Sequence, residues 1–187
     1  MIAGGRGLKM VRVLLAAAAF LLGMAPGLAQ SPTIALTPGD AAAVRIDPGG
    51  AVAITPEPGR AQWTPYELAA ARHLSGIPAP DRPEPYAHDL PSDGSIPPPP
   101  PLERGVVRFK FHSIAGRHSL LVIANGYERA IVYRARMTEG DRTRPTDVCL
   151  VVPGNHGFEH WPHPIDRLEI YDLRLVDWKE GDPLPCA

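Results

Sequence analysis

The sequence predicts an all-β protein: a small antiparallel immunoglobulin-like β-sandwich in residues 104–187, preceded by a proline-rich, largely irregular arm in residues 30–103. Three observations predict this. Apolar and polar residues alternate in the C-terminal region, no helical period of apolar residues occurs there, and sixteen of the 23 prolines lie in the arm. An alternation of two is typical of half-buried strands, whereas proline fixes φ and lacks a backbone donor.

Five strands are expected in the C-terminal region, and polar segments separate them. The expected strands cover residues 106–112, 119–124, 131–137, 147–152 and 166–176, with loops at 138–146 and 153–164. Asn125 and Gly126 form a strong β-hairpin signal between the second and third strands. The apolar alternation slips within the last strand, which predicts a β-bulge near Tyr171 and Asp172.

One short helix is expected within the arm, at about residues 65–75. Thr64 is a suitable N-cap, Pro65 suits the first helical position, and Glu67 completes a capping box. Gly76 ends the helix. An isolated helix of this length is marginal in water, so it either docks on the later domain or fluctuates.

The rest of the arm contains two further features. Residues 34–54 are expected to hold two short strands around a turn at residues 48–50. The run Pro97–Pro101 predicts a semi-rigid polyproline-II spacer, and its alternative role is that of a ligand for an aromatic groove.

Residues 1–29 have the pattern of a cleavable signal peptide. A basic segment without acidic residues precedes an apolar run at residues 13–25, and Gly27 and Ala29 occupy the cleavage positions. The apolar run is shorter than the ~20 residues that span a bilayer, although an uncleaved anchor is the alternative. Gln30 stands where a lipid-anchored bacterial protein needs Cys. We therefore expect a periplasmic or secreted protein with no membrane span after cleavage.

Charge distribution argues against nucleic acid as a partner. Residues 30–103 hold four basic and nine acidic residues, and residues 104–187 hold twelve basic and eleven acidic ones. No basic stripe of the kind that binds phosphate backbones is present. Arg108, Lys110, Arg134 and Arg136 are expected to line one sheet face, which either binds an anionic ligand or is solvated and paired with acids.

The chain contains two cysteines, Cys149 in an expected strand and Cys186 next to the C-terminus. An even pair in an oxidising compartment predicts a disulfide, which would tie the C-terminal tail to the sheet. The alternative is Cys149 as a catalytic nucleophile with a histidine partner, but no family signature surrounds it.

A histidine-rich segment carries the most specific hypothesis about a ligand. His156, Glu159, His160 and His163 are the predicted metal ligands, because imidazole with a carboxylate suits zinc or copper. In the alternative interpretation, the segment is a structured loop whose histidines are solvated or hydrogen-bonded, and Trp161 packs at the edge of the sandwich.

No nucleophile elbow, phosphate loop or HExxH motif occurs in the sequence, so no enzymatic activity and no cofactor are expected. The predicted function is that of an exported, non-catalytic binding or structural module with an envelope protein as a possible partner. The alternative is an exported copper- or zinc-binding protein that uses residues 156–163.

Overall fold

The computed structural model of the 187-residue chain describes residues 1, 32–77, 91 and 93–185. Contacts along the chain divide it into Met1–Gln30 and Ser31–Ala187, and the fold described below is that of the second unit. Apart from Met1, the predicted signal peptide lies outside the described residues. Within the described ranges, every helix is too short or too polar to cross a membrane.

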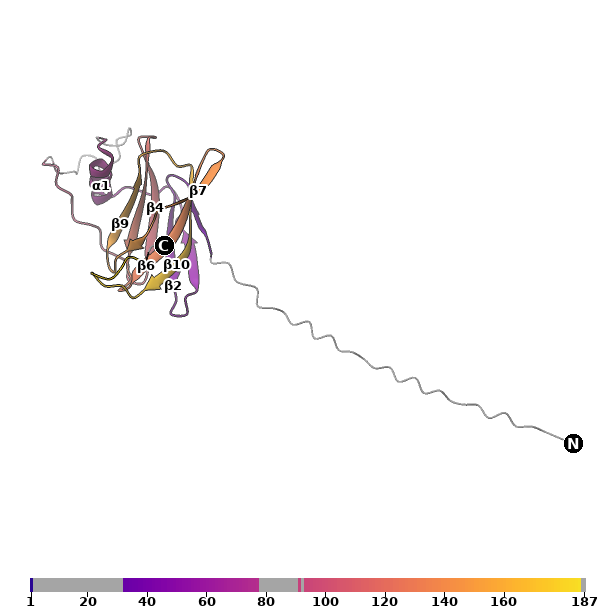
Figure 1. Ribbon diagram of the computed structural model, residues 1–187. Coiled ribbons are helices and arrows are strands. Elements are labelled where there is room, and N and C mark those ends of the chain that lie inside the picture. Colours follow the sequence, from indigo (N-terminus) through magenta and orange to yellow (C-terminus); the bar gives the residue numbers. More distant parts are fainter. Residues whose placement is uncertain (2–31, 78–90, 92, 186–187) are drawn as a thin grey trace. The chain divides into compact units, whose positions relative to one another are not determined.

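Ten strands and one helix make up the described part of the chain (Figure 1). In chain order they are β1 (Ile34–Leu36), β2 (Ala41–Ile46), β3 (Val52–Pro56), α1 (Pro65–Ser75), β4 (Val107–Ile114), β5 (His118–Asn125), β6 (Ala130–Glu139), β7 (Arg142–Thr146), β8 (Leu150–Val151), β9 (His156–Trp161) and β10 (Arg167–Val176). Sheet A has the order β1-β10-β6-β7, with β8 also paired to β6, and sheet B has the order β3-β2-β4-β5-β9. All strand pairs are antiparallel.

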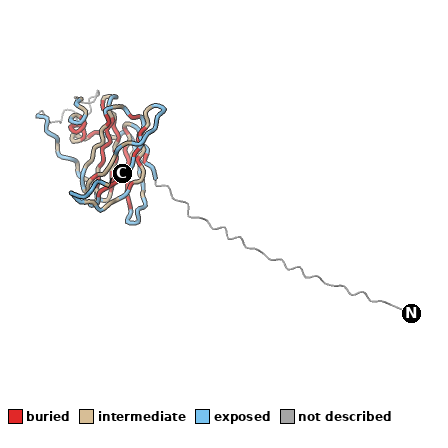
Figure 2. Tube along the Cα trace, viewed as in Figure 1, coloured by how far each residue is buried: buried red, intermediate tan, exposed pale blue. Residues whose placement is uncertain are grey.

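The two sheets share one apolar core, so the predicted all-β, antiparallel class is confirmed. Phe109 and Leu121 of sheet B are fully buried in the same cluster as Tyr133 and Ile170 of sheet A. The rings of Phe109 and Tyr133 meet edge to face across the core, with centroids 5.9 Å apart. Figure 2 shows the buried residues concentrated along the strands, with exposed residues at the turns.

The N-terminal part of the expected arm belongs to the sheets. Strand β1 pairs with β10 of sheet A, whereas β2 lies between β3 and β4 in sheet B. Pro38 and Pro48 lie in turns and Pro56 ends β3, so these prolines bound the strands without interrupting their ladders. The two strands expected in residues 34–54 correspond to β2 and β3, and β1 is an additional strand.

The expected helix is confirmed as α1, together with its capping box. The Glu67 N–H donates to the Thr64 hydroxyl at 3.2 Å, and the Thr64 N–H donates to the Glu67 carboxylate at 2.9 Å. The apolar face docks on the outer face of sheet B, where Leu68 and Ala71 are buried with residues of β5. Leu74, near the end of the helix, is exposed.

Replacing Thr64 by alanine is expected to lower the free energy of unfolding by about 1 kcal/mol, because the substitution removes the side-chain acceptor at the helix start. Chemical denaturation followed by far-ultraviolet circular dichroism measures the effect. Thr55 is an exposed threonine on β3, so Thr55→Ala is the matched control. An equal loss of stability in both variants would contradict the capping role.

The predicted hairpin at Asn125 and Gly126 is wrong, because β5 lies in sheet B and β6 lies in sheet A. Asn125 is fully buried, and its side-chain amide donates to the carbonyls of Arg129 and Val152 at 2.9 Å. A Cβ atom at Gly126 would lie 1.8 Å from the carbonyl oxygen of Glu103. The dipeptide therefore forms a tight crossover between the sheets.

Strands β7 and β9 occupy segments that were expected to be loops, and the strand expected at residues 147–152 is reduced to β8. In β9 the residues facing the core include Glu159 and Trp161, so neither face of this strand has an unbroken apolar pattern. The polar composition of β7, with Arg142 and Arg144, suits an edge strand. Because the strand lacks alternating apolar residues, the sequence pattern did not predict it.

The expected bulge in the last strand is confirmed. The register between β10 and β6 shifts between Tyr171 and Arg174. Asp172 takes a φ of 53° at this point, which is uncommon for a residue with a Cβ atom. The extra residue restores the outward orientation of polar side chains in the second half of β10.

Candidate functional site

The four predicted metal ligands do not come together. Because β9 is a strand, His156 and His160 lie on the outer face of sheet B, whereas Glu159 points toward sheet A. His163 follows the strand, and its Nδ1 atom lies 2.5 Å from the carboxylate of Glu139. Within the described ranges, no group of three or more His, Cys, Asp or Glu side chains is arranged to hold a metal ion.

Glu159 is instead a half-buried carboxylate between the sheets. The hydroxyl of Tyr133 donates to it at 3.2 Å, and the backbone N–H of Cys149 also donates to it. Burial raises the pKa of Glu159 above its ordinary value, although these hydrogen bonds lower it. Burial also raises the pKa of Tyr133 well above its ordinary value. The pair therefore links the two sheets.

His160 contacts a histidine outside the predicted set. Its Nε2 atom lies 2.9 Å from Nδ1 of His118, the first residue of β5. The two rings are stacked, with centroids 5.1 Å apart and planes inclined by 24°. Both side chains are half-exposed on the outer face of sheet B. This contact is called the imidazole pair below.

The described residues contain no free cysteine. Cys186 lies outside the described residues, so its pairing with Cys149 stays a prediction.

The basic residues expected on one face are divided between the two sheets. Arg134 and Arg136 lie on β6 of sheet A, where Arg136 pairs with Glu169. Arg108 and Lys110 lie on β4 of sheet B and enter a different group of ion pairs. The two pairs of cations therefore cannot form one anion-binding face.

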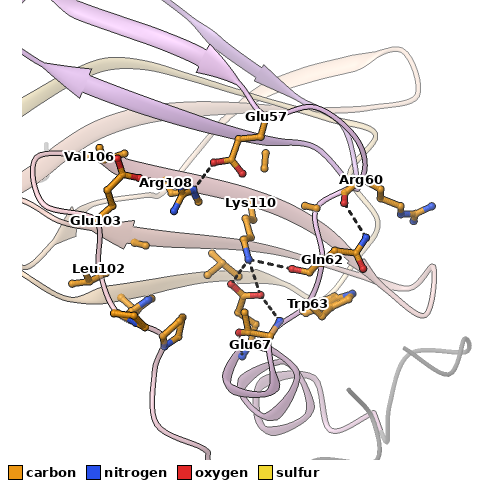
Figure 3. Close-up of a pocket in the computed structure, with 18 of the residues that line it drawn as sticks. Glu57, Arg60, Gln62, Trp63, Glu67, Leu102, Glu103, Val106, Arg108 and Lys110 are labelled. Carbon is orange, nitrogen blue, oxygen red and sulfur yellow. Dashed lines mark hydrogen bonds and ion pairs between the residues drawn. The ribbon is translucent and has the colours of Figure 1, made fainter. Parts of the chain in front are cut away.

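A pocket of about 540 Å³ lies on the outer face of sheet B. Helix α1, residues 57–64 before the helix, and residues 100–103 before β4 surround its floor of β-strand residues (Figure 3). The lining includes Glu57, Trp63, Glu67, Arg108, Lys110 and His156.

One wall of the pocket is an ion-pair network centred on Arg108. Its Nε atom donates to the carboxylate of Glu57, and its Nη2 atom donates to Glu103 at 3.1 Å. The other oxygen of Glu103 accepts a hydrogen bond from Arg45 at 2.8 Å. The hydrogen bond to Glu57 is the main cause that raises the pKa of Arg108. These contacts hold residues 57 and 103 against β4, as Figure 3 shows.

The opposite wall contains a buried ion pair between Lys110 and Glu67. The Nζ atom of Lys110 donates to the two carboxylate oxygens of Glu67 at 2.9 and 3.2 Å, and to the carbonyl of Gln62 at 3.1 Å. The side chain of Glu67 is 3% exposed and that of Lys110 is 17% exposed. Because Glu67 also caps α1, this pair fixes the start of the helix to the sheet.

An aromatic stack closes one end of the pocket. The indole of Trp63 lies on the imidazole of His112, with centroids 3.9 Å apart and planes inclined by 21°. Leu68 and Val122 pack against Trp63 in the same buried cluster. Burial is the main cause that lowers the pKa of His112 to about 3, and the nearby cation of Lys110 adds to it. His112 is therefore neutral at pH 7.

Three polar groups of the lining remain available to a ligand. Arg108 Nη1, Glu57 Oε2 and the ring nitrogens of His156 make no hydrogen bond to another described residue. The ring of Tyr66 contacts His156 edge to face, at a centroid distance of 5.3 Å. Burial lowers the pKa of His156, so a neutral imidazole faces the pocket at pH 7. The lining thus offers a cation, an anion and a neutral imidazole.

Comparison with known proteins adds no relative: no protein-family model matches this chain, and no curated protein or solved structure is significantly similar to it. The chemistry of the pocket is therefore the basis for a functional inference. The sequence indicated Arg108 and Lys110 as outward cations. It did not indicate that Glu57 and Glu67, from the expected arm, would meet them.

Proposed function

We propose that this protein is an exported, non-catalytic binding module whose pocket on sheet B takes a small zwitterionic molecule with an apolar body. The observation that carries the proposal is the mixed lining, in which ion-paired groups of both charges keep further hydrogen-bonding atoms beside an aromatic stack. The signal-peptide pattern supports export to the periplasm or the medium.

The size of the pocket supports a small molecule over a protein partner. Its volume of about 540 Å³ lies within the range of ligand sites, roughly 300–1,000 Å³. Three chain segments converge on one concave floor, whereas protein–protein contacts are usually broader and flatter.

The charges of the lining favour a zwitterion over a simple anion or cation. Glu57, Glu67 and Glu103 balance Arg60, Arg108 and Lys110. A ligand carboxylate would accept hydrogen bonds from Arg108, and a ligand ammonium would donate to Glu57. Arg108 and Glu57 pair with each other, but each keeps one atom without a hydrogen bond to a described residue. A zwitterion can use both of these atoms, whereas a ligand of a single charge can use one.

The two sheets over one core also support the immunoglobulin-like type of sandwich that we propose for the fold. The antiparallel pairing within both sheets agrees with that type. With five strands in each sheet, this sandwich has more strands than the seven of a constant-type immunoglobulin domain.

A substitution that fills the pocket tests its location. Ala124 lies on β5 and lines the pocket, whereas Ala53 is an exposed residue on β3 of the same sheet outside the lining. The probe is free leucyl-leucine, a dipeptide with an ammonium group, a carboxylate and two apolar side chains. Ala124→Phe is expected to reduce the affinity for this dipeptide at least tenfold, and Ala53→Phe is expected to leave the affinity unchanged. Isothermal titration calorimetry measures both. Equal affinities of the wild type and Ala124→Phe would contradict binding in this pocket.

Capped forms of the same dipeptide test the charge class. N-acetylation leaves only the carboxylate, and C-terminal amidation leaves only the ammonium group. Each change is expected to weaken binding at least tenfold. In the Arg108→Gln variant, the amidated and free dipeptides should bind with equal affinity. In the Glu57→Gln variant, the acetylated and free dipeptides should bind with equal affinity. Equal affinity for the free and capped forms, or no binding of any form at millimolar concentration, would contradict the zwitterionic class.

A further inference from the structure

The imidazole pair, His118 and His160, lies outside the pocket and has no role in the proposed binding of a zwitterion. Adjacent strands hold the two residues: Ser119 of β5 pairs in register with Trp161 of β9. Each histidine is one residue away from that backbone pair, on the outer face of sheet B. The ladder therefore sets the separation of the side chains, and solvent reaches both rings.

The distance between the two ring nitrogens matches one particular coordination geometry. His118 Nδ1 and His160 Nε2 are 2.9 Å apart and share a hydrogen bond, which a bound ion would replace. With metal–nitrogen bonds of about 2.0 Å, neighbouring ligands of a square-planar ion are ~2.8 Å apart, whereas those of a tetrahedral ion are ~3.3 Å apart. To bind one ion, both rings must turn so that their lone pairs leave the line between the two nitrogens and converge on the ion.

We propose that His118 and His160 form a binding site for Cu(II), in which the two imidazoles occupy neighbouring positions of a square plane and water occupies the others. Each ring is neutral when it binds. The proton of each imidazole then resides on the nitrogen that faces away from the ion, Nε2 of His118 and Nδ1 of His160. No covalent or redox step is involved, and the open positions remain accessible to an external ligand.

Copper is favoured over zinc by two independent arguments. The spacing suits a square plane, and nitrogen sites bind Cu(II) more tightly than Zn(II) in the general order of divalent affinities. The site shares only His160 with the metal-binding set that the sequence suggests.

Titration of the full chain with Cu(II), followed by calorimetry and electron paramagnetic resonance, tests the site. Two nitrogen ligands are expected in the spectrum, and Zn(II) is expected to bind at least tenfold more weakly. His118→Gln and His160→Gln should each reduce the Cu(II) affinity at least tenfold and remove one nitrogen from the spectrum. Both positions are half-exposed, and an unchanged thermal midpoint checks that the variants are folded.

His156→Gln and His163→Gln are the matched controls, because they change the other two histidines of the predicted set. Their Cu(II) affinity is expected to equal that of the wild type. A loss in either control as large as that in His118→Gln would overturn the proposed pair and favour the original set. An unchanged affinity in His118→Gln, or preference for Zn(II), would also overturn it.

Discussion

Replacing Lys110 by methionine is expected to lower the free energy of unfolding by about 3–5 kcal/mol, because the change leaves the carboxylate of Glu67 buried without its cation. Glu67 is 3% exposed, so water cannot replace the lost partner without disturbing α1. The backbone N–H of Thr64 is then the one hydrogen-bond donor that remains for this carboxylate among the described residues. Urea denaturation at pH 7 measures the change.

A double-mutant cycle separates the ion pair from the packing of the lysine stem. Adding Glu67→Gln to Lys110→Met removes the uncompensated charge, so the double variant is expected to be at least ~1 kcal/mol more stable than Lys110→Met alone. Arg104→Met is the matched control, because Arg104 pairs with Glu128 where both side chains are more than 80% exposed. That change should cost less than about 1 kcal/mol. A similar loss in Arg104→Met and Lys110→Met would contradict the interpretation.

Acidification from about pH 7.5 to pH 4.5 is expected to cost about 3 kcal/mol of stability through His112 alone. Burial lowers the pKa of His112 to about 3 from the ordinary value of 6.5. Between these values the unfolded chain binds a proton that the folded chain does not. The stabilisation is therefore fully present above pH 6.5 and is lost as the pH falls toward 3.

His112→Phe is expected to remove this pH dependence while keeping an aromatic ring against Trp63. The loss of stability between pH 7.5 and 4.5 should be about 3 kcal/mol smaller in the variant than in the wild type. The lowered pKa values of His156 and His160 also make the protein less stable as the pH falls. The raised pKa of Glu159 has the opposite effect on stability. All three remain in the variant. His73→Gln, at an exposed position of α1, should retain the wild-type loss. An identical loss in His112→Phe would contradict the assignment.

The parts of the fold that the sequence predicts well are those with a local cause. The capping residues Thr64 and Glu67 specify the helix start, and the slipped alternation near Asp172 specifies the bulge. The crossover at Asn125 and Gly126 depends instead on a distant residue. The backbone carbonyl of Glu103 lies so close to Gly126 that no residue with a Cβ atom fits there. No local pattern contains that contact, so the hairpin signal was misleading.

The site was harder to predict than the fold because its residues come from segments far apart in the chain. The alternation in β4 indicates that Arg108 and Lys110 point away from the core, but it does not indicate their partners. Likewise, histidine spacing in residues 156–163 suggests a cluster, whereas the strand conformation separates Glu159 from its neighbours. The partner of His160 is His118, which only the pairing of β5 with β9 brings near.

The paired charges of the pocket are also separated in the time of their synthesis. Glu57 and Arg108 are 51 residues apart, and Glu67 and Lys110 are 43 residues apart. At roughly 5–20 residues per second, a ribosome adds each acid at least about 2 s before its cation. A nascent chain that ends before β4 therefore carries hydrated, unpaired carboxylates and has no pocket floor. The pocket is consequently complete only after β4 has joined sheet B.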